Sequence, residues 1–177
     1  MAQQRVTPRR PNVIYILTDD QGPWAAGCYG NHEIRTPSID RLADTGVRFA
    51  NYYVACPVCS PSRATYLTGR INSQHGVHDW IHEGNSGEAA VEFLADEVAY
   101  TDVLASEGYH CGISGKWHMG DSFRPQHGFD FWYVHERGGG DYNAAPMIRD
   151  GELVIEDGYI TDIITDEALG YLDEHAG

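Results

Sequence analysis

Cys59, Pro61 and Arg63 lie at two-residue intervals in the segment whose residue types are best suited to chemistry. Ser60 fits the N-cap of a helix, Pro61 its first residue, and Gly69 its end. We therefore predict a helix that starts just after Cys59. The backbone N–H groups and the dipole at a helix N-terminus favour negative charge, so a thiol there loses its proton more easily. The segment indicates a nucleophile or its precursor. The alternative is a capped surface helix in which Cys59 is a small packing residue.

Two adjacent carboxylates, Asp19 and Asp20, follow a continuous apolar run over 12–17. Such a run is typical of a strand buried on both faces of a parallel sheet, and open α/β sheets bind ligands at the carboxyl ends of their strands. Paired carboxylates repel each other unless a cation lies between them, and oxygen ligands suit calcium or magnesium. The pair therefore predicts a divalent-cation site. The alternative is an acidic turn that ends at Gly22.

Lys116 and His118 lie between two glycines, directly after a predicted strand over 109–114. In an extended loop, residues two apart point the same way, so both side chains are expected to face one pocket at a strand end. The alternative is a solvated lysine beside a histidine in a turn. Together, the three predicted loops combine a cation site, a nucleophile precursor and cationic groups, which suits cleavage of an ester of a small, strong oxyanion.

Apolar runs alternate with helical patterns along the chain, which predicts an α/β fold. We expect strands at 12–17, 47–54, 109–114, 129–134 and 153–155, and helices at 36–46, 60–68, 101–107 and 159–174. The glycine-rich stretch 137–141 is expected to be a flexible loop. A helix in such an alternation normally leads back to another strand of the sheet, but none follows the last helix. The chain is therefore expected to be the N-terminal piece of a longer protein.

The net charge of −14, from 26 acidic and 12 basic residues, argues against nucleic acid or an anionic membrane surface as a partner. No apolar run approaches the roughly 18 residues of a membrane span, and the N-terminus lacks the features of a signal peptide. We expect a cytoplasmic protein if Met1 is the true start, and a periplasmic or secreted one if the true start lies upstream. The four cysteines are then expected to be thiols, with Cys28 and Cys111 as packing residues.

Four stretches together resemble the formylglycine-dependent sulfatases of the alkaline-phosphatase superfamily. Cys59-x-Pro61-x-Arg63 with Leu67–Arg70 resembles the family signature, and Asn12–Ile14 with Thr18–Gly22 resembles its first strand and metal loop. Gly115–Gly120 resembles its sulfate-site loop, and Gly158–Asp162 resembles a later family stretch. The resemblance implies the N-terminal part of a sulfatase catalytic domain over 11–177, after a polar tail over 1–10. It also implies an alkaline-phosphatase-like fold, in which a central, largely parallel or mixed sheet carries helices on both faces.

The resemblance further implies how a small sulfate monoester is cleaved. A formylglycine-generating maturation enzyme, the expected protein partner, oxidises Cys59 to an aldehyde. One oxygen of the aldehyde hydrate attacks sulfur and releases the alcohol, and the aldehyde then re-forms with release of sulfate. The expected cation is Ca²⁺ rather than Mg²⁺. The implied roles are cation ligation by Asp19, Asp20 and the modified Cys59, holding of the hydrate by Arg63, contact with sulfate oxygens by Lys116, and orientation of the hydrate by His118.

Three alternatives stay open at this point. The family's remaining cation ligands, its second sulfate-binding lysine and its leaving-group histidine cannot be placed in this chain, so the chain alone is expected to be inactive and poorly stable. A phosphonate monoester hydrolase or phosphodiesterase of the same superfamily would share the motifs. Finally, the C-x-x-C pair of Cys56 and Cys59 with His75 and His78 could form a structural zinc site.

Overall fold

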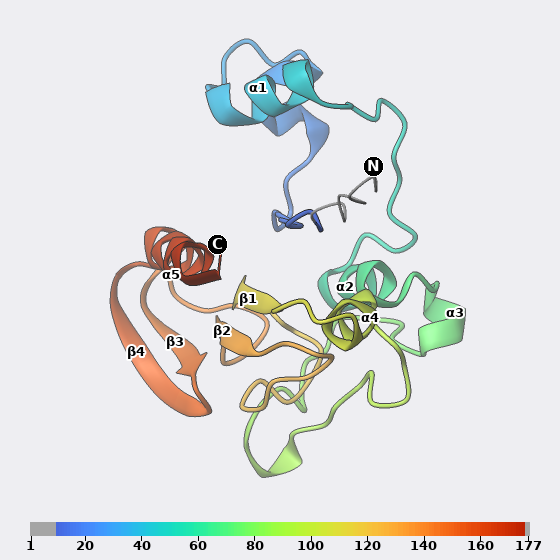
Figure 1. Ribbon diagram of the computed structural model, residues 1–177, viewed down its shortest axis with the longest axis vertical. Helices are drawn as coiled ribbons and strands as arrows, with labels where there is room; N and C mark the ends of the chain where they lie inside the picture. Colours follow the sequence, from blue (N-terminus) through green and yellow to red (C-terminus); the bar gives the residue numbers. More distant parts are fainter. Residues whose placement is uncertain (1–9, 176–177) are drawn as a thin grey trace, which may run out of the picture. The chain divides into compact units, whose positions relative to one another are not determined.

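The computed structural model describes residues 10–175, which form two compact units divided between Tyr52 and Tyr53 (Figure 1). Within residues 10–175, none of the helices has both the length and the apolar character needed to cross a membrane. All four cysteines, which lie in the described part of the chain, are free; Cys111 is buried and Cys28 is half-buried.

The N-terminal unit is built around helix α1 (Pro37–Thr45), which confirms the helix predicted over 36–46. Two short 3-10 helices, η1 (Pro23–Ala25) and η2 (Gly27–Tyr29), precede it. The Thr36 hydroxyl donates to Asp40 Oδ1 at 3.1 Å and accepts from the Gly27 N–H at 2.8 Å. Asp40 Oδ1 also accepts from the Cys28 N–H at 2.7 Å. These bonds fix the start of α1 against η2.

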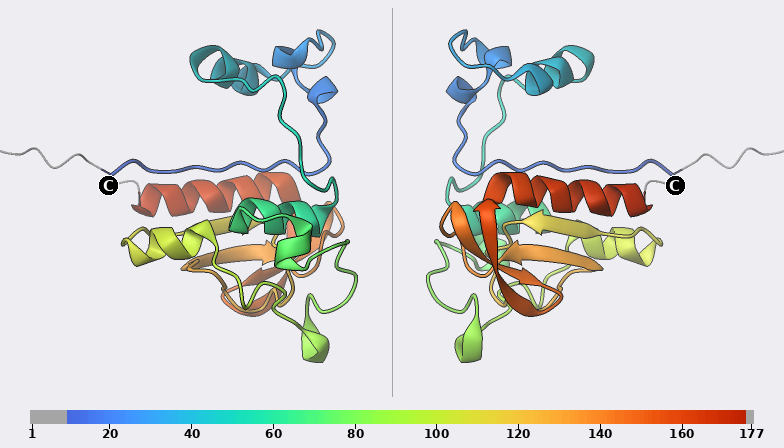
Figure 2. Two further views of the ribbon diagram at one scale, coloured as in Figure 1. Left: turned by 90° about the vertical axis from the view of Figure 1, so that its right-hand side faces the viewer. Right: turned by 90° about the vertical axis from the view of Figure 1, so that its left-hand side faces the viewer.

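The strands predicted over 12–17 and 47–54 are wrong, because neither segment forms one. The first is an extended stretch without strand pairing, visible in blue in Figure 2. Side chains expected in a core are instead exposed, with values of 77% for Ile16 and 81% for Val47. β-Branched and aromatic composition describes what fits a half-buried pleated surface, but a strand needs a hydrogen-bonded neighbour to form. The local sequence carries no information about that neighbour.

The C-terminal unit contains a four-stranded sheet in the order β1-β2-β3-β4. Its strands are β1 (Gly112–Gly115), β2 (Phe131–His135), β3 (Asn143–Arg149) and β4 (Glu152–Tyr159). β1 pairs with β2 in parallel, and the other pairs are antiparallel. Three strands confirm the predictions near 109–114, 129–134 and 153–155, the last as an edge of this sheet. β3 was missed because Pro146 and two alanines lie within it.

Helices cover both faces of this sheet. They are α2 (Cys59–Thr68), α3 (Asn72–His75), α4 (Tyr100–Ser106) and α5 (Ile160–His175), with a 3-10 turn η3 (Gly87–Ala89) between α3 and α4. Figure 1 shows α5 on one side of β1 and β2, and α2 and α4 on the other. The helices predicted over 60–68, 101–107 and 159–174 are confirmed to within about two residues, which is the usual uncertainty of helix ends. The α/β class with helices on both faces is therefore confirmed.

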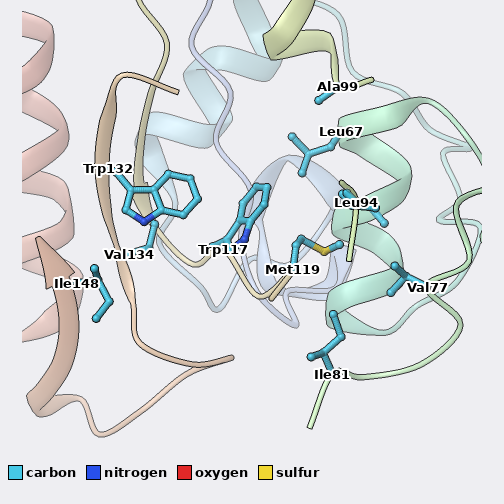
Figure 3. Close-up of a cluster of buried hydrophobic side chains, with 11 residues drawn as sticks. Leu67, Val77, Ile81, Leu94, Ala99, Trp117, Met119, Trp132, Val134 and Ile148 are labelled. Carbon is cyan, nitrogen blue, oxygen red and sulfur yellow. The ribbon is translucent and has the colours of Figure 1, made fainter. Parts of the chain in front are cut away.

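Alternate residues of β2 supply two separate hydrophobic clusters. Trp132 and Val134 face α2, and the cluster on that side includes Trp117, whose ring lies 5.1 Å from that of Trp132 (Figure 3). Tyr133, between them in sequence, faces the opposite side with Met147 and Ile160 of α5. This alternation follows from the period of two in a strand. It places the loop that contains Trp117 directly against the α2 side of the sheet.

A cluster of ionised side chains attaches α5 to the sheet. Arg149 of β3 donates to Glu167 of α5 at 2.9 and 2.8 Å and to Glu156 of β4 at 3.2 Å. Its guanidinium also lies 4.7 Å from the centroid of the Tyr133 ring, whose hydroxyl donates to Glu156 at 2.8 Å. Burial, together with that hydrogen bond, raises the pKa of Tyr133. The cluster joins β2, β3, β4 and α5 through paired charges.

His75 of α3 should make the stability of this unit depend on pH. Its side chain is buried, Nδ1 accepts from the Val77 N–H at 3.1 Å, and Nε2 lies 3.2 Å from the Thr65 hydroxyl. Burial lowers the pKa of His75. The unfolded chain therefore takes up this proton more readily, and stability present above about pH 6.5 is lost as the pH falls. Urea unfolding from pH 7.5 to pH 5 should show a smaller loss in His75→Gln than in wild type, whereas equal losses would contradict the prediction.

Candidate active site

Cys59 is the first residue of α2, which confirms its predicted place at a helix N-terminus. The predicted capping by Ser60 is wrong, since the N-cap is Val58, whose carbonyl accepts from the Ser62 N–H at 3.0 Å. The reason is that Ser60 is fully buried and its hydroxyl is used elsewhere, as the acceptor of a hydrogen bond from the Ile81 N–H at 3.2 Å. Gly69 ends the helix with a φ of 67°, as expected for a left-handed C-terminal residue.

Arg63 joins α2 to the loop that contains Lys116 and His118. It lies one helical turn after Cys59 and is only 6% exposed. Its Nη1 donates to the backbone carbonyl of Lys116 at 2.6 Å, across 53 residues of sequence. A charged donor makes this hydrogen bond stronger than one between neutral groups. Two of the three sequence motifs are thus brought together within the C-terminal unit.

His118 is held in one orientation by backbone groups. It is 2% exposed and has a φ of 59°, which is uncommon for a residue with a side chain. Its Nε2 lies 2.9 Å from the carbonyl oxygen of Ile81. A carbonyl can only accept, so Nε2 must carry the proton. Because the Ile81 N–H bonds to Ser60, one residue connects the start of α2 with the ring of His118.

Ser60 and Ile81 were therefore missed as residues that build the site. Ser60 stands inside the signature segment, but its residue type favoured a cap and gave no hint of a partner 21 residues away. Ile81 acts through its backbone, and its side-chain type carries no signal for that role. The predicted flexible loop over 137–141 also contributes, because Gly138 packs against the imidazole of His118.

Replacing Gly138 with alanine should displace His118 and destabilise the C-terminal unit. A Cβ at position 138 would overlap the His118 ring. Overpacking of this kind typically costs about 1–3 kcal/mol, which urea unfolding would measure. The matched control is Gly170→Ala in α5, where a Cβ meets nothing within 4 Å. That variant should be stabilised by up to about 1 kcal/mol, since alanine is favoured over glycine inside a helix. Equal unfolding free energies for both variants would contradict the predicted overlap.

Asp19 and Asp20 lie in the N-terminal unit, and the other predicted site residues lie in the C-terminal unit. Both carboxylates are exposed, and Asp20 has a φ of 53°. Adjacent carboxylates of this kind have the oxygen donors that a hard cation prefers, so the donor set fits calcium. A joint site of Asp19, Asp20 and Cys59 therefore stays a prediction.

The zinc alternative has little support in the C-terminal unit. Both ring nitrogens of His75 are engaged, one by the Val77 N–H and the other by the Thr65 hydroxyl. A zinc ion would have to replace one of these bonds and leave a buried group without its partner, which costs about 1–3 kcal/mol. His78 is exposed. The arrangement therefore indicates a structural role for His75.

The comparison with protein families matches the sulfatase family over residues 11–177. The chain is 38% identical over 174 residues to an N-acetylglucosamine-6-O-sulfatase of Bacteroides thetaiotaomicron, covering 96% of this chain and 29% of that protein. It is 39% identical over 140 residues to human arylsulfatase A, covering 73% of this chain and 27% of the other. The chain thus spans less than a third of the length of each of these two relatives.

A solved structure agrees with these relatives. It is described as a protein in complex with its substrate, D-glucosamine-2-N,6-O-disulfate, and superposes with a TM-score of 0.81 at 38% identity. The match covers 93% of this chain and 31% of that one. At this similarity the mixed sheet with helices on both faces is the alkaline-phosphatase-like fold of that group. The chain therefore belongs to the sulfatase family.

Proposed function

We propose that the protein containing this chain is a sulfuric ester hydrolase that cleaves a sulfate monoester. The observation that best supports the proposal is the hydrogen bond from Arg63 Nη1 to the Lys116 carbonyl at 2.6 Å. It places the helix that begins with Cys59 beside the loop with Lys116 and His118, as a single sulfate-binding pocket requires.

In this proposal the chain's own residues bind and orient the ester. Lys116 places a positive charge where negative charge develops on the sulfate oxygens, and such preorganised charge is usually the largest contribution to catalysis. Arg63 holds the nucleophilic group at position 59 and keeps the Lys116 backbone in place. His118, with its proton fixed on Nε2 by the Ile81 carbonyl, presents Nδ1 as the other functional atom of the ring.

Two groups supplied to the chain complete the proposal. A formylglycine derived from Cys59 by a maturation enzyme supplies the nucleophilic oxygen, and a calcium ion supplies a Lewis acid that lowers the pKa of bound oxygen nucleophiles. The residues that would hold the ion are Asp19, Asp20 and the modified Cys59. Further ligands would come from outside this chain.

The substrate is proposed to be a sugar sulfate. This rests on two proteins to which the chain is similar, an N-acetylglucosamine-6-O-sulfatase and a protein solved in complex with a disulfated glucosamine. Both cover more than nine-tenths of this chain. An amino sugar that carries a 6-O-sulfate is therefore the first substrate to test.

The test is release of inorganic sulfate by the full-length protein, produced in a host that contains the maturation enzyme. Turnover of an amino-sugar 6-sulfate and of an aryl sulfate, abolished by a chelator and restored by calcium, is the expected result. Faster turnover of an aryl phosphonate or a phosphodiester than of any sulfate would instead support the phosphonate monoester hydrolase alternative. Sulfate release by protein whose Cys59 is unmodified would contradict the formylglycine part of the proposal.

The 177-residue chain produced alone should show no sulfate release. The family's remaining cation ligands, second lysine and leaving-group histidine are not placed in this sequence, so the chain alone would supply part of the pocket. The comparison is with full-length protein of equal formylglycine content, measured by mass spectrometry. Turnover by the chain alone that depends on Cys59 would contradict the prediction.

A further inference from the structure

An open pocket of about 300 Å³ lies beside His118 in the C-terminal unit. It is lined by Trp80, Ile81, His82, Asn85 and residues 137–139. Three of these residues also contact or neighbour His118. The Ile81 carbonyl is hydrogen bonded to its Nε2, the Trp80 ring centroid lies 6.0 Å from that of its imidazole, and Gly138 packs against the same ring. The pocket therefore lies next to His118, one of the residues of the proposed sulfate site.

The walls of the pocket combine an aromatic surface with polar groups. Trp80 is 49% exposed, and His82 meets it edge-on with ring centroids 4.8 Å apart. Asn85 is 4% exposed and donates through Nδ2 to the Ile81 carbonyl at 3.1 Å. Among the described residues its amide oxygen has no hydrogen-bond partner, which is rare for a buried polar atom. The lining therefore combines one exposed aromatic face with one buried amide.

Arg137 gives the pocket a positive charge in a chain whose net charge is −14. Its contact with Glu136 is long, at 3.6 Å, and its side chain is 69% exposed. Exposed ion pairs of this kind contribute little to stability. Glu136 has another partner, because it accepts from the Ser86 hydroxyl at 2.9 Å. An anionic group of a ligand can thus bind the guanidinium of Arg137, and no strong interaction within the protein has to break.

We propose that this pocket binds the alcohol half of the ester, as a single sugar ring whose second anionic substituent faces Arg137. This inference rests on the proposed sulfatase function and deepens it by naming specificity-determining residues. The apolar C–H face of a sugar ring packs against an indole ring, which offers a large and rigid contact surface. The volume is at the lower end of the range for small-molecule sites, so it suits one ring rather than an oligosaccharide. A guanidinium recognises sulfate or carboxylate through paired hydrogen bonds.

The test measures ligand affinity without turnover, in the full-length protein with calcium present. A Cys59→Ala background prevents hydrolysis, and calorimetry gives the Kd of three probes: N-acetylglucosamine 6-sulfate, glucosamine 2-N,6-O-disulfate and inorganic sulfate. Arg137→Gln should weaken binding of the disulfate about tenfold and of the other two less than about threefold. Trp80→Ala should weaken both sugars about tenfold or more while sulfate binds as before, and Trp80→Phe should restore most of the loss.

The matched control is Arg124→Gln, since Arg124 is also exposed and paired with a carboxylate, at 2.7 Å, but does not line this pocket. It should change no Kd by more than about twofold. Equal weakening of all three probes by Trp80→Ala would show a structural role and overturn the proposal. So would equal weakening of both sugars by Arg137→Gln, or failure of the background protein to bind either sugar. If the variants show these changes in Kd but the wild-type protein hydrolyses no sulfate ester, the result would contradict the proposed function and not the sugar-binding pocket.

Discussion

Replacing Cys59 with alanine should abolish sulfate release by the full-length protein, with a fall in kcat of at least about 10³-fold. The change removes the proposed nucleophile at the first residue of α2. It should alter folding little, because the Cys59 side chain is only half-buried and removal of one sulfur atom leaves the buried Ser60 and Arg63 in place. Circular dichroism and urea unfolding, compared with wild type, would separate the chemical loss from a folding defect.

Cys59→Ser is the sharper form of the same experiment. Serine keeps an oxygen at the site but has no second hydroxyl with which to expel sulfate from a sulfated enzyme. We therefore expect it to be inactive in turnover as well. Mass analysis of the peptide 48–63 from wild type should show an aldehyde in place of the thiol. Full turnover by Cys59→Ser, or an unmodified thiol in fully active wild type, would contradict the proposed chemistry.

Replacing Arg63 with alanine should have the second-largest effect, because it removes one group that acts on both halves of the pocket. Arg63 is buried, and its loss leaves the Lys116 carbonyl without its donor. Loss of a hydrogen bond to a charged group typically costs about 1.5–3 kcal/mol of stability. Removing one charge-stabilising donor typically lowers kcat by about 10² to 10³-fold. The free energy of unfolding and kcat should fall together, because the same hydrogen bond holds the Lys116 loop in place.

Arg70→Ala is the matched control for this prediction. Arg70 follows the same helix and forms an ion pair with Glu97 at 2.7 Å, but its side chain is 48% exposed. An exposed pair contributes about 0.2–1 kcal/mol, so this variant should unfold almost as wild type does. Formylglycine content must be measured for each variant, because Arg63 belongs to the maturation signature. A stable Arg63→Ala protein with normal turnover per aldehyde would refute the role given to Arg63.

The helices and the motif loops were predictable because their signals are local. Thr36 with Pro37, and Gly69 after an apolar turn, mark helix ends through the conformations that those residue types prefer. Strand pairing could not be predicted in the same way, as the segments over 12–17 and 47–54 show. Both have strand composition, yet pairing depends on residues far away in the sequence.

The hairpin of β3 and β4 does have a local signal in its turn. β3 and β4 are joined by Asp150 and Gly151, which have φ values of 51° and 80°. Asp-Gly with both residues in the left-handed region is the favoured two-residue hairpin turn. Pro146 lies within β3, and proline is disfavoured inside a strand, so the composition of β3 alone does not predict it. Among the proposed site residues, Asp19, Asp20, Cys59, Arg63, Lys116 and His118 are predicted from motifs, and their roles stay predictions. Ser60, Ile81 and Gly138 emerge only from contacts in the folded unit.

The burial of the signature segment has a consequence for the order of events during synthesis. In the folded unit, Ser60 and Pro61 are fully buried and Arg63 is nearly so. A maturation enzyme that must read these side chains cannot reach them once α2 has packed against the Lys116 loop. Under the proposed maturation, modification and folding therefore compete for the same nascent chain. The fraction of active molecules is then set by the ratio of two rates, and a variant that folds faster would be more stable yet less active.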